Sequence, residues 1–361
     1  MKKLLIVLLV ALLSLSFVAC SGTVQYIDLT DWKPYDYEKL TYTITEEGSE
    51  LEGTLTMEME ELDGDVKYDM PVVDATEKKV VPTKIDMKKN YFILTRTLSF
   101  PTSKGGEDVM YNVTLTDDRL NPLYSFASLV MADEQVSYTG TGDAPDCVTY
   151  FTSSKYTQNK DNSKWSVTST YLRQLKYGEL DTTKWFTKTQ TFENLEENSS
   201  DMNLLYYNLR FINNLTDTDD FTYRCSVPMA LESTIKTLNC TGAVEQYAVD
   251  DRIPYVYNEY KAIGENYGGF GLDLVKVNIF LTNQSVTGSG IAIYYSRAPM
   301  LAKEEIPQAT SENLTTLSKD IGSYRIPVMI VENSRPSTTS SLYPDSRGTI
   351  TYRLREITNQ K

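Results

Sequence analysis

The sequence predicts a mainly β protein, built from antiparallel strands in two lobes with one short helix between them. Three observations predict this class. Apolar and polar residues alternate with a period of two along many segments, glycine-containing turns separate these segments, and Tyr, a residue that suits a pleated, half-buried surface, occurs 26 times in 361 residues. With 41% hydrophobic residues, a chain of this length can bury a sizeable core.

The first twenty residues predict export and lipid anchoring. Two lysines precede an apolar run over residues 4–19, and Cys20 follows the small residue Ala19, as at the cleavage site of a bacterial lipoprotein signal. An uncleaved membrane helix is the alternative, but a span needs about 20 apolar residues, and polar residues follow Cys20 at once. We therefore expect a signal peptide over 1–19, lipidation of Cys20 and a tether over 20–37, on the outside of a bacterial membrane.

Strands are predicted wherever apolar and polar residues alternate. The pattern is clear over residues 51–59, 275–282 and 349–355. In each segment one face is apolar and the other polar, which is typical of an antiparallel sheet with one solvated face. We expect strands of this kind along most of the chain after the tether.

One short helix is predicted near the middle of the chain. Apolar residues recur there at steps of three or four, after side chains that can cap a helix start: Met202, Leu205, Leu209 and Ile212 follow Ser199, Ser200 and Asp201. A polar stretch precedes this helix. We therefore expect an N-terminal β lobe over 38–195 and a C-terminal β lobe over 196–361.

Three short motifs of the second half resemble a family of exported bacterial proteins of unknown function. They are residues 204–210 (LLYYNLR), 293–299 (IYYSRAP) and 325–328 (RIPV), the last followed by Gly348 and a closing strand. The resemblance implies a pair of curved antiparallel sheets, similar to the open half-barrels of the outer-membrane lipoprotein carriers. It assigns no catalytic residue to this chain.

Composition argues against several functions. The chain carries 35 basic and 49 acidic residues, a formal net charge of −14, so its surface repels phosphate backbones and we expect no nucleic-acid partner. It contains no histidine, which removes the Ser-His-Asp and Cys-His nucleophile systems and the commonest zinc ligand. No nucleotide-binding loop motif is present. We expect a protein that is not an enzyme and holds neither metal nor cofactor.

Two of the cysteines form a candidate disulfide. Cys225 and Cys240 lie in alternating segments, 221–229 and 234–241. With a turn at 232–233, the two residues fall opposite one another, where strand positions are close enough to bridge. An exported protein permits such a bond. Two ordinary half-buried thiols are the alternative.

Carboxylates and aromatic residues supply the remaining functional signals. Glu58 and Glu60 share one strand face, a spacing that two-carboxylate glycosidases can use, although the acidic turn beside them favours an ordinary solvated face. Trp165 and Trp185 lie at the two ends of a stretch that a glycan-binding surface could use. The even spread of tyrosine along the predicted strands favours a core role for the aromatics instead.

Three function classes stay open. The first is a membrane-anchored, extracytoplasmic binding module that holds an apolar or lipid-like ligand on a concave sheet. The second is a non-enzymatic scaffold or interaction protein of the cell envelope. The third is a glycan-binding or carbohydrate-active protein. An apolar, continuous concave face favours the first class, a filled face favours the second, and a cleft with carboxylates and an exposed tryptophan favours the third.

Overall fold

The computed structural model describes most of the chain after the predicted tether. The described residues are 23–24, 35–101, 107–130, 146–158, 165–176, 183–195, 199–211, 220–227, 234–246, 273–281, 290–296, 299–310, 312–313, 316–317, 320, 325–333 and 349–361. The predicted signal peptide and Cys20 lie outside them and stay predictions. Within the described part of the chain, no helix is both long enough and apolar enough to cross a membrane.

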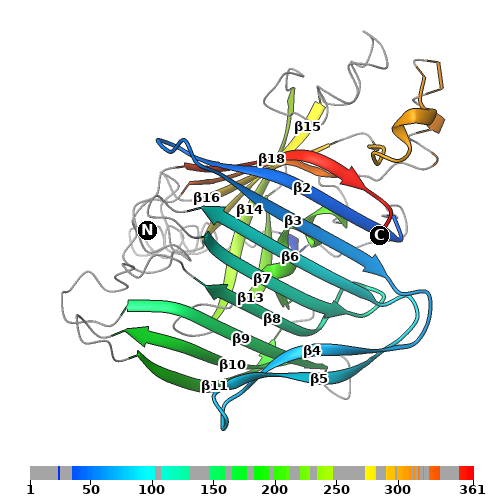
Figure 1. The fold of residues 1–361 in the computed structure, drawn as a ribbon. Helices are drawn as coiled ribbons and strands as arrows, with labels where there is room; N and C mark the ends of the chain where they lie inside the picture. Colours follow the sequence, from blue (N-terminus) through cyan, green and yellow to red (C-terminus); the bar gives the residue numbers. More distant parts are fainter. Residues whose placement is uncertain are drawn as a thin grey trace, which may run out of the picture.

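Strands dominate the structure, which confirms the mainly antiparallel β class (Figure 1). The strands are β1 (Thr23–Val24), β2 (Tyr37–Glu46), β3 (Glu52–Glu61), β4 (Val66–Asp74), β5 (Lys79–Met87), β6 (Phe92–Pro101), β7 (Glu107–Thr116), β8 (Pro122–Val130), β9 (Asp146–Gln158), β10 (Trp165–Lys176), β11 (Thr183–Leu195), β12 (Ser199–Asp201), β13 (Asp220–Val227), β14 (Thr234–Gln246), β15 (Asp273–Leu281), β16 (Gly290–Ser296), β17 (Pro327–Asn333) and β18 (Thr349–Thr358). The alternating segments of the sequence predicted β3, β15 and β18 to within a few residues.

Sixteen of these strands form one continuous sheet, and β4 and β5 form a separate hairpin. The order along the large sheet is β1-β13-β14-β15-β16-β17-β18-β2-β3-β6-β7-β8-β9-β10-β11, with β12 beside β13. Only the pairings of β1 and β12 with β13 are parallel. Because β18 pairs with β2, strands from the two predicted lobes belong to the same sheet. The lobe boundary at residue 195 therefore does not separate two sheets.

The predicted tether contributes to the sheet at two points. Thr23 and Val24 form β1, which pairs with Phe221 and Thr222 of β13. Residue Tyr37, where the tether was expected to end, is already the first residue of β2. The stretch between the predicted anchor and the globule is therefore shorter than the sequence pattern implied.

A short helical segment interrupts the strands, as the sequence predicted. It consists of η1 (Met202–Leu204), α2 (Leu205–Asn208) and η2 (Leu209–Phe211), and we call Met202–Phe211 the central segment. The carboxylate of Asp201 accepts a hydrogen bond from the Asn203 backbone N–H at 2.8 Å, so Asp201 is the N-cap. A further single turn, η4 (Ile306–Gln308), follows β16.

Most of the sheet packs its inner face around the central segment (Figure 1). We call the inner face the side of the sheet that touches this segment, and the outer face the opposite side. One apolar cluster contains inner-face residues of strands from both ends of the chain together with the central segment. A second, smaller cluster lies on the outer face, where the β4–β5 hairpin covers β8, β9 and β10.

The hairpin of β13 and β14 corrects the register on which the cysteine pairing was based. Cys225 lies opposite Lys236, and Cys240 lies opposite Phe221. The two cysteines are therefore displaced by four residues, or about 13 Å along the strand, whereas a disulfide needs Cα atoms within roughly 7 Å. The predicted register was wrong because Val227 lies opposite Thr234, whereas a turn at 232–233 would place residue 231 opposite Thr234.

Candidate functional site

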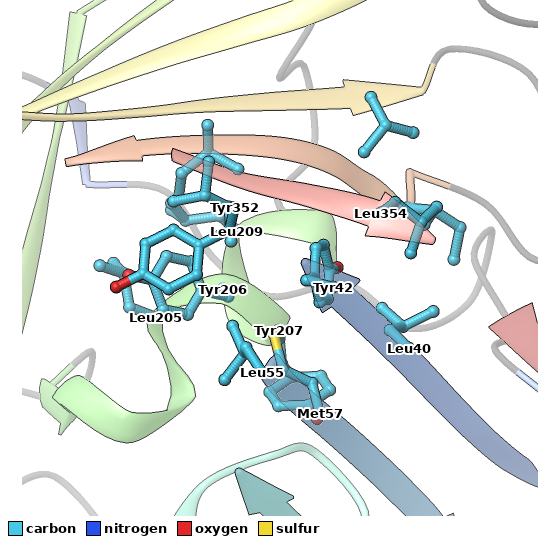
Figure 2. Packing of buried hydrophobic residues seen from close by; sticks show 14 of the residues in the cluster. Leu40, Tyr42, Leu55, Met57, Leu205, Tyr206, Tyr207, Leu209, Tyr352 and Leu354 are labelled. Atoms are coloured by element: carbon cyan, nitrogen blue, oxygen red, sulfur yellow. The ribbon is translucent and has the colours of Figure 1, made fainter. Parts of the chain in front are cut away.

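The inner face of the sheet is the natural place for a ligand, and the central segment occupies it. Leu204, Leu205 and Leu209 are each 0% exposed and pack against inner-face residues of β2, β3 and β18. Figure 2 shows this packing, with side chains of the segment lying between those of the strands: Leu40, Tyr42, Leu55, Met57, Tyr352 and Leu354. The segment takes this position because apolar side chains project from it on all sides, and every residue from Asn203 to Phe211 is buried.

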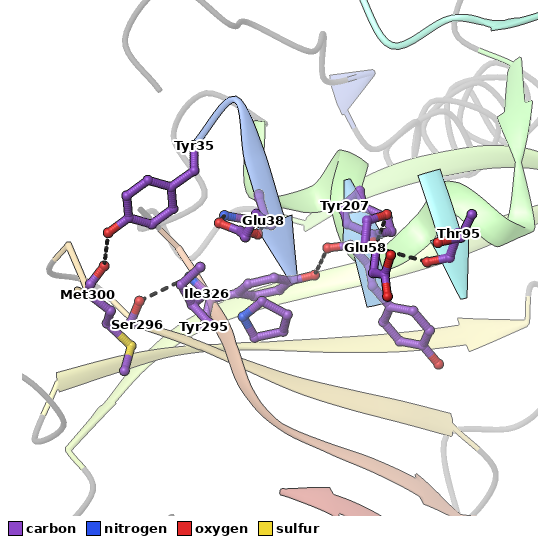
Figure 3. Close-up of polar contacts among 12 residues, drawn as sticks. Tyr35, Glu38, Glu58, Thr95, Tyr207, Tyr295, Ser296, Met300 and Ile326 are labelled. Atoms are coloured by element: carbon purple, nitrogen blue, oxygen red, sulfur yellow. Dashed lines mark hydrogen bonds and ion pairs between the residues drawn. The ribbon is translucent and has the colours of Figure 1, made fainter. Parts of the chain in front are cut away.

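Two tyrosines of the central segment anchor it by their hydroxyl groups. The Tyr206 hydroxyl donates to Glu332 Oε1 at 2.6 Å, and the Tyr207 hydroxyl donates to the Glu58 carbonyl at 3.0 Å. Figure 3 shows Tyr207 reaching the strand backbone at Glu58 and Thr95. Burial raises the pKa of both Tyr206 and Tyr207 well above its usual value. Both hydroxyls are therefore neutral donors that hold the segment to neighbouring strands.

The three motifs that carry the family resemblance meet at the central segment. Tyr295, from the second motif, donates to the Tyr206 carbonyl at 3.1 Å. Arg325, from the third motif, donates to the Arg210 carbonyl at 3.2 Å. The second and third motifs also bond to each other, because the Ile326 N–H donates to Ser296 Oγ at 3.0 Å (Figure 3). The motif residues therefore build one buried structural unit.

Arg210 and Glu38 form a buried ion pair between η2 and β2. Arg210 Nη1 lies 2.5 Å from Glu38 Oε1 and Nη2 lies 3.1 Å from Oε2, so the pairing is bidentate. The two side chains are 1% and 0% exposed. Burial by itself disfavours the guanidinium charge, but the Glu38 carboxylate raises the pKa of Arg210 above its usual value. The pair ties the end of the central segment to β2.

Arg325 binds the C-terminal end of the central segment, and its own backbone is strained. Its φ of 48° lies in the left-handed region, which is uncommon for a residue with a side chain. The side chain is buried and donates to the Arg210 carbonyl, one of the carbonyls that a helix end leaves without an intrahelical partner. Burial lowers the pKa of Arg325 to about 10. The residue therefore remains charged at neutral pH.

The beginning of the central segment lies over a buried polar cluster on β8, β9 and β10. Asp201 is 0% exposed, and its Oδ2 accepts hydrogen bonds from the Ser125 hydroxyl at 2.6 Å and from the Tyr156 hydroxyl. Beside it, the hydroxyls of Ser154 and Ser169 lie 2.7 Å apart. The carboxylate is thus held by neutral donors and by the helix cap.

Four buried polar atoms in this neighbourhood have no hydrogen-bond partner among the described residues. They are Asn112 Oδ1, Thr114 Oγ1, Thr152 Oγ1 and Asn203 Nδ2. In the strand register, Asn112 and Thr152 lie on either side of Ala127. The inner face is therefore polar here, and it contains several buried polar atoms without a hydrogen-bond partner among the described residues.

The carboxylate pair singled out in the sequence lies on the outer face in ordinary surface contacts. Glu58 forms an ion pair with Lys39 at 3.0 Å and accepts a hydrogen bond from Tyr37, while Glu60 pairs with Lys361. Their side chains are 33% and 29% exposed, as the solvated-face interpretation expected. Within the described ranges, no group of three or more Cys, Asp or Glu residues is placed to hold a metal ion.

A row of aromatic rings crosses the outer face from β7 to β11. The ring centroids of Tyr111 and Phe126 lie 6.5 Å apart, those of Phe126 and Phe151 lie 6.3 Å apart, and those of Phe151 and Trp185 lie 6.3 Å apart. The β4–β5 hairpin covers the first part of the row, whereas Trp185 is 39% exposed. Trp165, the other tryptophan singled out in the sequence, is buried. The core interpretation is thus right for Trp165 and wrong for Trp185.

Comparisons with known proteins add little to this picture. No family model and no curated protein matches the chain. Among solved structures, it is similar to the crystal structure of a β-barrel-like protein of domain of unknown function DUF1849 from Brucella abortus, with 11% sequence identity and a TM-score of 0.32. The match covers 93% of this chain and 99% of that chain. Both are β proteins, and a TM-score of this size assigns no shared fold or function.

Proposed function

We propose that this chain is a membrane-anchored, extracytoplasmic binding module without enzymatic activity, which meets its partner on the outside of the sheet. The observation that carries the proposal is the central segment on the inner face. Leu205 and Leu209 are buried there, so the chain itself fills the face on which the carrier class expected an apolar ligand. Like the scaffold class, the proposed module has a filled inner face. Like the binding class, it has a ligand, which binds on the outer face.

Displacing the central segment would be costly, which supports a permanently filled inner face. Opening it would break the buried Arg210–Glu38 pair and the hydrogen bonds of Tyr206 and Tyr207. If Arg210 moves away while Glu38 stays buried, the unpaired carboxylate costs about 3–5 kcal/mol. A lipid carrier that opened this face would have to recover that free energy from each ligand.

Native mass spectrometry with organic extraction tests the filled inner face. The sample is the mature chain from Ser21, which contains every residue that the structure describes. The expected result is the mass of the protein alone, with no lipid in the extract. A lipid or other apolar molecule at near-stoichiometric amount would contradict the proposal and restore the carrier class.

Fractionation of a Cys20→Ala variant tests the anchor. Two acyl chains on Cys20 give stable membrane attachment, so the wild-type protein should remain with the membrane after a salt wash and the variant should not. Retention of the variant on membranes would show that residues 4–19 act as an uncleaved anchor instead. Ser21→Ala is the matched control, since it changes the next side chain and leaves the acylated cysteine in place.

A further inference from the structure

The outer face of β10 and β11 carries an ordered array of hydroxyl groups beside Trp185. Thr170 lies opposite Thr189, and Thr168 lies opposite Thr191. Their hydroxyl oxygens lie 3.0 Å apart in the first pair and 3.1 Å apart in the second. Each pair uses one donor, so one hydroxyl hydrogen and several lone pairs per pair remain for another molecule. We call these four threonines and Trp185 the threonine–tryptophan face.

The position of Trp185 in this array is fixed by stacking. Its ring lies nearly parallel to that of Phe151, with an interplanar angle of 20°, and Phe151 stacks in turn on Phe126. The supporting rings belong to the packed part of the sheet, because Phe126 is buried in the hairpin-covered cluster. An exposed aromatic ring that is held rigid loses little conformational entropy when a flat apolar surface stacks on it.

Strand parity places Trp185 and the threonines on one side of the sheet. Trp185, Thr187, Thr189 and Thr191 alternate along β11, so every position of this strand that shares that face from 185 to 191 is Trp or Thr. The run is about 20 Å long by strand rise. Strand β11 also ends the strand order of the sheet, so this surface lies at the side of the molecule.

We infer that the threonine–tryptophan face binds a neutral oligosaccharide, an inference that rests on the proposed binding function and names its ligand class. The apolar face of a sugar ring stacks on an aromatic ring, and its hydroxyl groups exchange hydrogen bonds with threonine hydroxyls. The length of the face suits several consecutive sugar units rather than one. The formal net charge of −14 favours a neutral glycan over an acidic one, because like charges repel at a distance.

A matched pair of variants is available because Trp185 and Phe186 are neighbours of similar exposure on opposite faces. Trp185 is 39% and Phe186 is 45% exposed. The Phe186 ring instead lies on the inner face, where the Arg173 guanidinium is 4.7 Å from its centroid. Trp185→Ala should therefore weaken glycan binding while Phe186→Ala leaves it unchanged. A Thr189→Val, Thr191→Val double variant removes two hydroxyls and keeps the β-branched shape, so it retains the fold.

The experiment is binding of the mature chain from Ser21 to an array of immobilised neutral oligosaccharides, with acidic oligosaccharides on the same array, followed by titration calorimetry on the best series. We expect binding to a neutral series, a loss of about tenfold in affinity for Trp185→Ala and for the threonine double variant, and no change for Phe186→Ala. Circular dichroism spectra confirm that each variant is folded.

Three outcomes would overturn the inference. They are no binding to any neutral series, binding only to acidic series, and equal losses for Trp185→Ala and Phe186→Ala. Self-association that Trp185→Ala abolishes, without glycan binding, would assign the face to a second copy of the chain. Each of these outcomes leaves the proposed filled inner face intact, because that proposal is tested separately by extracting the protein for a bound apolar molecule.

Discussion

Two regions of the same sheet carry their apolar side chains on opposite faces. Around the central segment, the inner face is apolar and the outer face carries charged residues such as Glu58 and Lys39. Across β7, β8 and β9, many buried inner-face residues are polar, such as Asn112, Thr114 and Ser125, and the outer face carries the apolar side chains under the hairpin. Further along, at β10 and β11, Trp165, Val167 and Phe192 form a small apolar cluster on the inner face. Strand β7 contains the change, because Met110 points into the main core while Val113 and Leu115 belong to the hairpin-covered cluster.

The difference shows that the covering element decides which face of a strand is apolar. In the first region the central segment covers the inner face, and in the second the β4–β5 hairpin covers the outer face. The period of two is the same in both regions. Strand β11 contributes no described residue to the hairpin-covered cluster and keeps Trp185 exposed on the outer face, where this side chain forms part of the surface that we propose as functional.

Breaking the ion pair of the first region should give the largest effect. Arg210→Met leaves the Glu38 carboxylate buried without its partner, so the free energy of unfolding should fall by about 3–5 kcal/mol in urea titrations. Lys39→Met, which breaks the exposed pair with Glu58, should change it by less than about 1 kcal/mol. Equal effects of the two substitutions would mean that the Arg210–Glu38 pair is hydrated.

Alkaline pH should weaken the first region next. Burial holds the pKa of Tyr42, Tyr206 and Tyr207 above the value of 10.0 that applies to the unfolded chain. Between these values the folded protein retains protons that the unfolded chain releases, so stability is complete below pH 10.0 and falls above it. Above this pH, each of these tyrosines lowers the free energy of unfolding by about 1.4 kcal/mol per pH unit.

Arg325 acts in the opposite direction over the same range. Its pKa of about 10 in the folded protein lies below the ordinary 12.5. Between these values the folded protein releases a proton that the unfolded chain keeps, so Arg325 makes the free energy of unfolding rise with pH and offsets one tyrosine. Urea unfolding at a series of alkaline pH values measures the net slope. Tyr206→Phe should make this slope shallower by about 1.4 kcal/mol per pH unit. A stability that is flat above pH 10.0 would show that the three tyrosines ionise freely in the folded state.

Adding one methyl group to β3, in the first region, should have a smaller effect. A Cβ atom at Gly53 would lie 2.5 Å from Phe100 Cδ2 and 2.6 Å from the Ser99 carbonyl oxygen. The backbone oxygen cannot move aside, so Gly53→Ala should destabilise the protein by about 3 kcal/mol in thermal or urea unfolding. Gly64→Ala, with nothing within 4 Å, is the control and should be nearly neutral. A neutral Gly53→Ala would mean that β3 and β6 lie further apart than the structure shows.

The polar inner face of the second region should give the smallest and most informative differences. Ser125→Ala removes a donor to the buried Asp201 carboxylate and should destabilise the protein by about 1.5 kcal/mol. Thr152→Val removes a hydroxyl that has no partner among the described residues, so it should be neutral or stabilise by up to about 1 kcal/mol. Equal losses for both variants, measured by urea unfolding, would show that the Thr152 hydroxyl is hydrogen-bonded.

Local patterns predicted the local structure well. The period of two predicted strands such as β3 and β18, and the three candidate capping residues before the central segment included Asp201, which is the N-cap. These features depend on residues that are neighbours in the sequence. The sequence also held one unused signal, since Glu38 shares the strand face of Leu40, Tyr42 and Ile44, where a charged residue needs a buried partner.

The long-range features could not be predicted in this way. The partner of Glu38 is Arg210, 172 residues away, and nothing in either local pattern names the other. The register of the cysteine hairpin depended on where the turn lies, and a wrong turn displaced every pair. Trp185 and Trp165 lie in similar alternating segments, and only the position of covering elements makes one exposed and the other buried.

The measurement that most directly tests the filled inner face is hydrogen–deuterium exchange of the central segment in the mature chain, followed by mass spectrometry of its peptides. If Met202–Phe211 is a permanent part of the core, its amides should exchange as slowly as those of β2 and β3, which pack against it. Exchange as fast as that of the edge strand β11 would show that the segment leaves the inner face readily. The face would then be open to a ligand, contrary to the function proposed here.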